Sequence, residues 1–132
     1  MPDRQLFINL PVSSLDRSVK FFKELGFEFV SELTNETAAC MSISGSAFAM
    51  LVSNSRFSDF TPKIICNARE RCEAIIAVSA DSKEEVDALY DKAMALGASK
   101  VRDPEDHAFM YGRSFNDLDG HVWEVFWMDL PD

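Results

Sequence analysis

The sequence predicts an α+β fold made of two βαβββ modules that face one another across a pocket between curved mixed sheets. Two observations predict it. The order of a strand, a capped helix that ends in glycine and three further strands occurs in residues 5–53 and again in residues 73–128. The segment Leu25-Gly26-Phe27 of the first copy also corresponds to Leu96-Gly97-Ala98 of the second. Internal repeats of this kind identify folds that are built from copies of one unit.

The first module begins with a predicted strand over residues 6–12. Ser13 and Ser14 follow, and Asp16 stands three residues after Ser13, which is the spacing of a capping box at the start of a helix. Gly26 is predicted to end this helix as the residue after the C-cap. Residues 27–52 then contain three strand-like runs separated by polar turns. The helix has one apolar face, formed by Leu15, Val19, Phe22 and Leu25.

The second module repeats this order. Residues 74–79 form a predicted strand, and Glu85 stands three residues after Ser82, again with capping-box spacing. Gly97 is predicted to end the helix. Three short strands follow, over residues 99–101, 109–115 and 121–127, and a turn at 116–120 joins the last two.

Residues 54–72 lie between the modules. This stretch contains Pro62 and the charged run Arg69-Glu70-Arg71, and we predict a linker with one short helix. The chain has 132 residues, of which 47% are hydrophobic, so it can bury a core of its own. We therefore predict a single domain over residues 1–132.

Charge and cysteine content restrict the partners and the location. The formal net charge is −9, which opposes nucleic acid and anionic membranes because their phosphates would be repelled. No apolar run approaches the roughly 20 residues that span a bilayer. The three cysteines, Cys40, Cys66 and Cys72, give neither a disulfide framework nor a zinc signature. We expect reduced thiols and a cytoplasmic protein.

Two stretches carry a resemblance to a known family. LPVSSLDRSVKFFKELGF at residues 10–27 and DLDGHVWEV at residues 117–125 resemble segments of the vicinal-oxygen-chelate superfamily. This superfamily includes glyoxalase I, extradiol dioxygenases, and the bleomycin and fosfomycin resistance proteins. The resemblance covers almost the whole chain. It implies a glyoxalase/bleomycin-resistance/dioxygenase-type fold, a small-molecule ligand and a homodimer.

The resemblance also implies four strand positions that hold one divalent metal ion in metal-dependent members. Here they fall on Phe7, Met50, Ile75 and Glu124, and a two-residue slip would replace Ile75 by Glu73. Phenylalanine and isoleucine have no lone pair to donate, and a methionine thioether is a poor ligand for these ions. Only Glu124 keeps a metal-binding side chain. We therefore predict no cofactor. The alternative is a divalent metal at an altered site.

Strand alternation predicts which side chains face the pocket. Glu124 is its principal polar group, and a partly desolvated carboxylate can act as a general base or acid. The alternative is that Glu124 pairs with Arg113 or hydrogen-bonds to Asn9 as a structural residue. The predicted ligand-binding residues on the strands are Phe7, Asn9, Phe48, Met50 and Ile75.

Four further side chains are candidates. Tyr111 and Arg113 share one face of the penultimate strand and could fix a polar or anionic ligand group, or they could belong to an ordinary amphipathic strand. His121 is predicted to be a turn residue on the opposite face from Glu124. His107 lies in an acidic stretch whose spacing matches no known metal site.

Three function classes remain open. The chain binds a small, largely apolar or aromatic molecule without metal, or it is a lyase or dioxygenase-type enzyme of the superfamily. In that enzyme Glu124 would be the base, or the ligand of a metal at an altered site. The third class is an interaction scaffold, which no residue supports. The missing ligands favour the first class.

Overall fold

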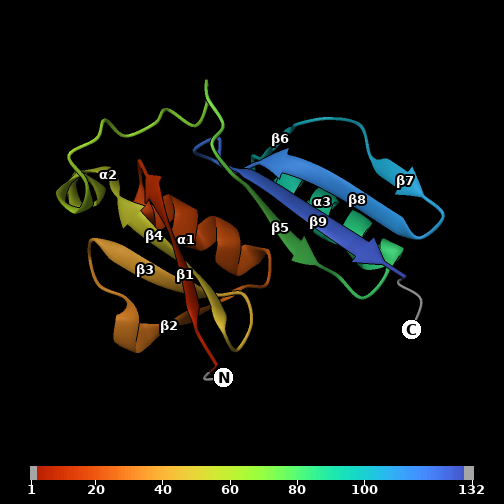
Figure 1. Ribbon diagram of the computed structural model, residues 1–132, viewed down its shortest axis with the longest axis horizontal. Helices are drawn as coiled ribbons and strands as arrows, with labels where there is room; N and C mark the ends of the chain where they lie inside the picture. The colour runs from red at the N-terminus through yellow and green to blue at the C-terminus, as the bar shows by residue number, and fades with distance from the viewer. Residues whose placement is uncertain (1–2, 130–132) are drawn as a thin grey trace. The chain divides into compact units, whose positions relative to one another are not determined.

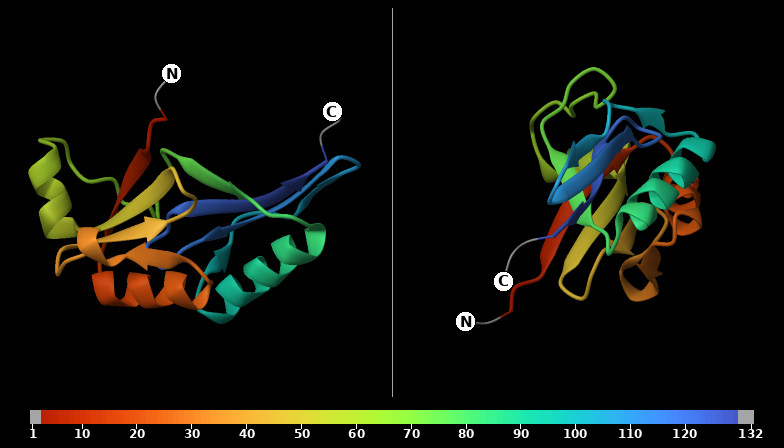
Figure 2. Two further views of the ribbon diagram at one scale, coloured as in Figure 1. Left: turned by 90° about the horizontal axis from the view of Figure 1, so that it is seen from below. Right: turned by 90° about the vertical axis from the view of Figure 1, so that its right-hand side faces the viewer.

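The computed structural model describes residues 3–129, so the ends of the predicted domain at 1–2 and 130–132 lie outside the described residues. The chain divides between Cys66 and Asn67 into two compact units, called the first and second unit below. Each unit contains a mixed sheet, and its main helix lies along one face of that sheet (Figures 1 and 2). The two units hold the two predicted modules.

The first unit has a four-stranded sheet in the order β1-β4-β3-β2. Strand β1 is parallel to β4, and the other neighbours are antiparallel. The predicted order of a strand, a helix and three strands is confirmed. The elements are β1 (Leu6–Val12), α1 (Leu15–Glu24), β2 (Glu28–Val30), the 3-10 helix η1 (Ser31–Leu33), β3 (Ala38–Ser42), β4 (Ala47–Ser53), α2 (Asn54–Phe57) and the 3-10 helix η2 (Ser58–Phe60).

The second unit has the strand order β5-β9-β8-β6, with β7 also paired to β8. Strand β5 is parallel to β9, so this sheet repeats the first one with an additional strand. The elements are β5 (Ile75–Ser79), α3 (Lys83–Ala95), β6 (Ser99–Lys100), β7 (Glu105–His107), β8 (Met110–Asn116) and β9 (Val122–Met128).

Strand β7 is not predicted by the sequence, because residues 103–107 have the composition of an acidic loop. The strand pairs antiparallel with β8, with Glu105 opposite Gly112 and His107 opposite Met110. Its sequence Glu-Asp-His has low intrinsic strand preference, which is tolerated in a short strand at the edge of a sheet. Pairing with β8 therefore overrides the local sequence signal.

Helices α1 and α3 begin and end as the sequence indicates, with one correction. Ser82 accepts a hydrogen bond from the Glu85 amide at 3.0 Å and caps α3. In α1 the N-cap is Ser14, which accepts from the Arg17 amide at 3.4 Å, and not Ser13. Gly26 and Gly97 follow the two helices with φ of 106° and 111°, where glycine avoids the strain of a side chain. Within residues 3–129 no helix combines the length and apolar character that crossing a membrane requires.

The predicted linker is divided between the two units. Helix α2 follows β4 directly and contacts β1 and β4, which places it in the first unit. Arg69, at the other end, donates to the Leu118 carbonyl at 2.7 Å within the second unit. The short predicted helix is confirmed, but most of the segment belongs to one unit or the other.

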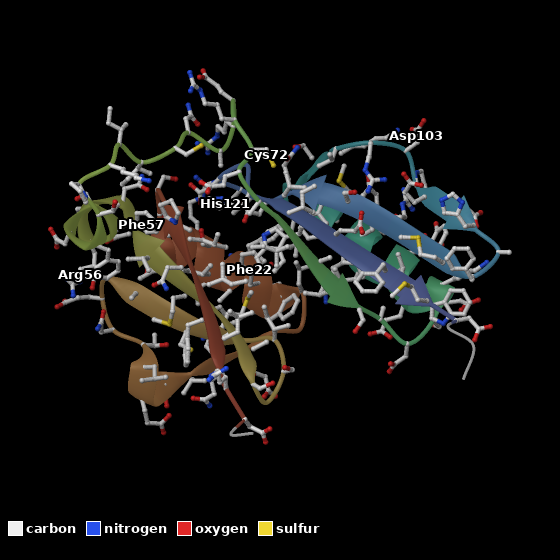
Figure 3. All side chains as sticks on the ribbon, viewed as in Figure 1. Phe22, Arg56, Phe57, Cys72, Asp103 and His121 are labelled. Atoms are coloured by element: carbon white, nitrogen blue, oxygen red, sulfur yellow. The ribbon has the colours of Figure 1, made fainter. Side chains whose placement is uncertain are left out.

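The core of each unit lies between its sheet and its main helix. In the first unit Phe22, labelled in Figure 3, and Leu51 are almost fully buried. In the second unit Val86 of α3 is buried on the helix, and Trp123 and Val125 are buried on β9. Alternate residues on each strand point to the opposite face of the sheet. That opposite face, called the open face below, carries the candidate site residues.

The turn before β9 is built around Asp117. Its carboxylate accepts from the Asp119 and His121 amides and from Trp123 Nε1, at 2.9, 3.0 and 3.0 Å. Burial raises the pKa of Asp117, and these hydrogen bonds oppose the shift. Gly120 has φ of 93°, and a Cβ there would lie 2.8 Å from the Ala68 carbonyl. The D-x-D-G sequence is therefore explained as a structural turn.

Candidate functional site

The open face of the first unit carries a stacked pair of aromatic rings. Phe7 of β1 lies opposite Phe48 of β4, and their ring centroids are 4.8 Å apart with an interplanar angle of 13°. Phe48 is buried, whereas Phe7 is 39% exposed. Asn9, also exposed, lies opposite the half-buried Met50 in the next row. The structure thus brings four of the predicted ligand-binding residues together.

The open face of the second unit carries Glu124. Ala77 of β5 and Ser114 of β8 lie opposite Glu124 on its two sides, so these three residues form one row across the sheet. The side chain of Glu124 is 14% exposed. Ile75 lies on the same face one row away and is 60% exposed. The predicted placement of Ile75 and Glu124 on one face is confirmed.

Glu124 forms an ion pair with Arg102 and not with Arg113. Arg102 also bonds to Glu105 through Nη1 at 3.1 Å, and Glu105 Oε2 lies 3.0 Å from His107 Nε2. Glu124, Arg102, Glu105 and His107, which alternate between acidic and basic side chains, therefore form a connected network from β9 to β7. The alternative pairing of Glu124 with Arg113 is wrong.

Arg102 follows β6, on the connection that also carries Asp103 in Figure 3. The neighbouring Val101 amide donates to the Ser114 carbonyl at 3.4 Å. Strand β8 lies between β6 and β9, so the Arg102 side chain must cross β8 to reach Glu124. The sequence signal for this pair is weak: one arginine in an acidic stretch, where several carboxylates are equally close along the chain.

Tyr111 and Arg113 lie on the helix face of the second sheet, opposite to Glu124. The Tyr111 hydroxyl donates to Asp87 Oδ1 of α3 at 2.6 Å, and Arg113 Nη1 lies 3.2 Å from the same oxygen. The Arg113 guanidinium also covers the Tyr90 ring at 3.8 Å. The hydrogen bond to Asp87 raises the pKa of Tyr111. Tyr111 and Arg113 share one face of β8 as predicted, but that face packs against α3, and Ser114 holds the position beside Glu124 on the open face.

Comparison with known proteins places the chain in a family. A model of the Glyoxalase/Bleomycin resistance protein/Dioxygenase superfamily matches residues 4–125, so the chain belongs to this superfamily. The resemblance seen in the sequence is confirmed. No curated protein matches.

Solved structures share the fold. A hypothetical protein from S. aureus is 28% identical, with a TM-score of 0.81 over 96% of this chain and 94% of that one. The fosfomycin resistance protein FosX from Mesorhizobium loti is 18% identical, with a TM-score of 0.71 over 98% and 96%. TioX from Micromonospora sp. ML1 is 20% identical, with a TM-score of 0.66 over 96% and 98%.

The residues present do not fit the family's divalent metal. Phe7, Met50 and Ile75 offer no suitable donor, and the residue opposite Glu124 on β5 is Ala77. Glu73 is exposed and precedes β5. Among residues 3–129 there is no group of three or more His, Cys, Asp or Glu side chains that could hold a metal ion.

Proposed function

We propose that this protein binds a small, largely apolar or aromatic molecule on the open faces of its sheets, without the family's metal. The observation that carries the proposal is Phe7, an aromatic side chain that stays 39% exposed although it stacks on Phe48. An exposed ring that already stacks on a neighbour gives a ligand ring a flat surface for stacking. Asn9 beside it supplies a polar group that can orient the ligand.

Membership of the superfamily supports this proposal, because the fold supplies two sheets with open faces. The energetics also favour an apolar ligand. Burial of apolar surface contributes about 25 cal/mol per Å², and an aromatic pair adds about 0.5–1.5 kcal/mol beyond that. The FosX and TioX structures share the fold alone, so their names do not define this ligand.

The alternative, an enzyme that uses Glu124 as a base, has one supporting observation. Glu124 is a mostly buried carboxylate on the open face. Because Arg102 donates to its Oε2 atom, a substrate would have to approach the other oxygen. The ion pair therefore favours the binding function.

A titration with 2-methylnaphthalene, followed by ¹H–¹⁵N correlation spectra, tests the proposal. We expect saturable shifts of the Phe7 and Asn9 amides, and Phe7→Ala should weaken binding at this face about tenfold. Leu33→Ala is the matched control, because Leu33 is 48% exposed but follows β2 at the opposite edge of the same sheet. Equal affinity of Phe7→Ala and wild type, or no saturable shift in wild type, would contradict the proposal.

We also propose that the protein is a cytoplasmic homodimer. Strands β1 and β5 each form one edge of their sheet. They carry the exposed apolar side chains Leu6 and Ile75. Unpaired strand edges with apolar side chains favour association. Multi-angle light scattering should give twice the 14.9 kDa chain mass. A monomer at micromolar concentration would contradict the dimer.

A further inference from the structure

We propose that Arg102, Glu124 and Ser114 form a binding site for a neutral hydroxyl group, that of an alcohol or a phenol, on an otherwise apolar molecule. The inference rests on the proposed binding function, and it specifies the polar group that the bound molecule would carry. It is carried by hydrogen-bonding atoms on the open face of the second unit that have no partner among residues 3–129.

Arg102 supplies the donors. A guanidinium carries five N–H groups. Within the described residues Arg102 donates only to Glu105 and Glu124, which leaves three N–H groups without a protein partner. The side chain is 40% exposed, so a ligand can reach it. The two carboxylates hold the guanidinium in position, and this reduces the entropy that binding would cost.

Ser114 is the second, independent observation. It is 2% exposed, and its hydroxyl oxygen is buried without a hydrogen-bond partner in the described part of the chain. Ser114 lies opposite Glu124 on the same face, in the region that the Arg102 side chain crosses. Buried hydroxyls without partners are rare and costly, because they have lost water without replacing it. A ligand atom at this row would supply the missing partner.

The site combines acceptors with donors. Glu124 Oε1 accepts no hydrogen bond from residues 3–129, so it can accept one from a ligand while Arg102 holds Oε2. A ligand hydroxyl can donate to Glu124 and accept from Arg102 at the same time. A ketone or an ether can only accept, and it would leave the carboxylate oxygen without a partner. The donor and acceptor pattern therefore favours a hydroxyl.

The charge of the site disfavours an anion. Two carboxylates, Glu105 and Glu124, flank the single guanidinium of Arg102, so the three side chains together carry one negative charge. An anionic ligand would be attracted by one charge and repelled by two. The net charge of −9 on the whole chain adds to this repulsion.

The neighbouring positions on the same face of β9 are apolar. Val122 and Phe126 lie on the same face of β9 as Glu124, one row to each side, and both are half-buried. Ile75 lies opposite Val122 and is largely exposed. A ring or chain attached to the hydroxyl can rest on these side chains. The ligand that fits is therefore apolar, with one neutral hydroxyl group.

Three probes of one size test the inference: 2-naphthol, 2-methylnaphthalene and 2-naphthoate. Affinities are taken from the shifts of the Ala77, Ser114 and Glu124 amides in ¹H–¹⁵N correlation spectra. We expect 2-naphthol to bind about tenfold more tightly than 2-methylnaphthalene, and 2-naphthoate to bind more weakly than both. Ser114→Ala and Arg102→Met should each remove the preference for naphthol over methylnaphthalene. Arg56→Met is the matched control, because Arg56 forms an exposed ion pair in the first unit.

The outcomes separate the two proposals. If 2-methylnaphthalene and 2-naphthol bind equally well, the hydroxyl site is wrong and the proposed function stands. Tightest binding of 2-naphthoate, or a naphthol preference that survives in Ser114→Ala and Arg102→Met, also overturns the site. If no probe binds anywhere on the chain, both proposals fail. Ser114→Ala keeps the test decisive if Arg102→Met does not fold.

Discussion

Arg102 and Glu124 form an ion pair across strand β8, although they are 22 residues apart in the chain. The pair joins the connection after β6 to strand β9. It gives the mostly buried Glu124 a charged partner on the open face of the second unit. The guanidinium of Arg102 thus pairs with one carboxylate oxygen of Glu124, at the strand position where the family resemblance implies a metal ligand.

Removal of Arg102 should leave Glu124 partly buried without a partner. We expect Arg102→Met to lower the free energy of unfolding by about 1–2 kcal/mol, between the values for exposed and for fully buried ion pairs. Urea denaturation of Arg102→Met, Glu124→Gln and the double variant measures the coupling of the two side chains. Additive effects of the two substitutions would show that the pair is not coupled.

Metal binding should be absent at the family's position. We expect elemental analysis of the purified protein to find no stoichiometric divalent ion, because only one of the four positions can donate. Added Mn²⁺ or Zn²⁺ should leave Tm unchanged, since an ion that binds only the folded state would raise it. A stoichiometric ion that is lost in Glu124→Gln would overturn the metal-free function and favour the enzyme.

Tyr111 should make the stability depend on pH in the alkaline range. Its hydrogen bond to Asp87 raises its pKa above the ordinary value of 10.0, so the folded state holds the phenol proton more tightly than the unfolded chain does. This stabilisation is complete below the unfolded pKa and is lost as the pH rises through the folded one. Tyr111→Phe should cost about 1 kcal/mol at neutral pH, and the difference should shrink above pH about 10.

Asp87→Asn is the second variant for this pH dependence. It keeps the phenol but removes the carboxylate that raises the pKa, so it should weaken the alkaline loss of stability. Denaturation by urea at several pH values measures both variants. A constant difference between wild type and Tyr111→Phe across the alkaline range would contradict the prediction.

Gly120 should not tolerate a side chain. At φ of 93°, an added Cβ would lie 2.8 Å from the backbone of Ala68, so Gly120→Ala should cost about 2–4 kcal/mol. Gly45→Ala is the control, because a Cβ added there would meet no atom within 4 Å and the φ of Gly45 is not positive. Thermal unfolding compares the two variants, and equal Tm values would count against the strain at Gly120.

The sequence determined the repeat and the fold. The ends of the two main helices lie where the sequence indicates, with Ser82 as a cap and Gly26 and Gly97 as terminating residues. Caps and left-handed residues act through their nearest neighbours, so a local sequence pattern reveals them. Alternation along β1, β5 and β9 placed Phe7, Ile75 and Glu124 on open faces, since the side-chain period of a strand is fixed by its geometry. The mismatch between Phe7, Met50 and Ile75 and the family's metal ligands is a property of the residue types alone.

Only the tertiary structure decided which side chains meet. Strand β7 exists because it pairs with β8, and Tyr111 and Arg113 face α3 because of the register of β8 with β9. A shift of one residue exchanges the two faces of a strand, and sequence alone does not fix that register. The pairing of Arg102 with Glu124 depends on a side chain that crosses a whole strand. Such long-range contacts are set by packing, and no local pattern contains them.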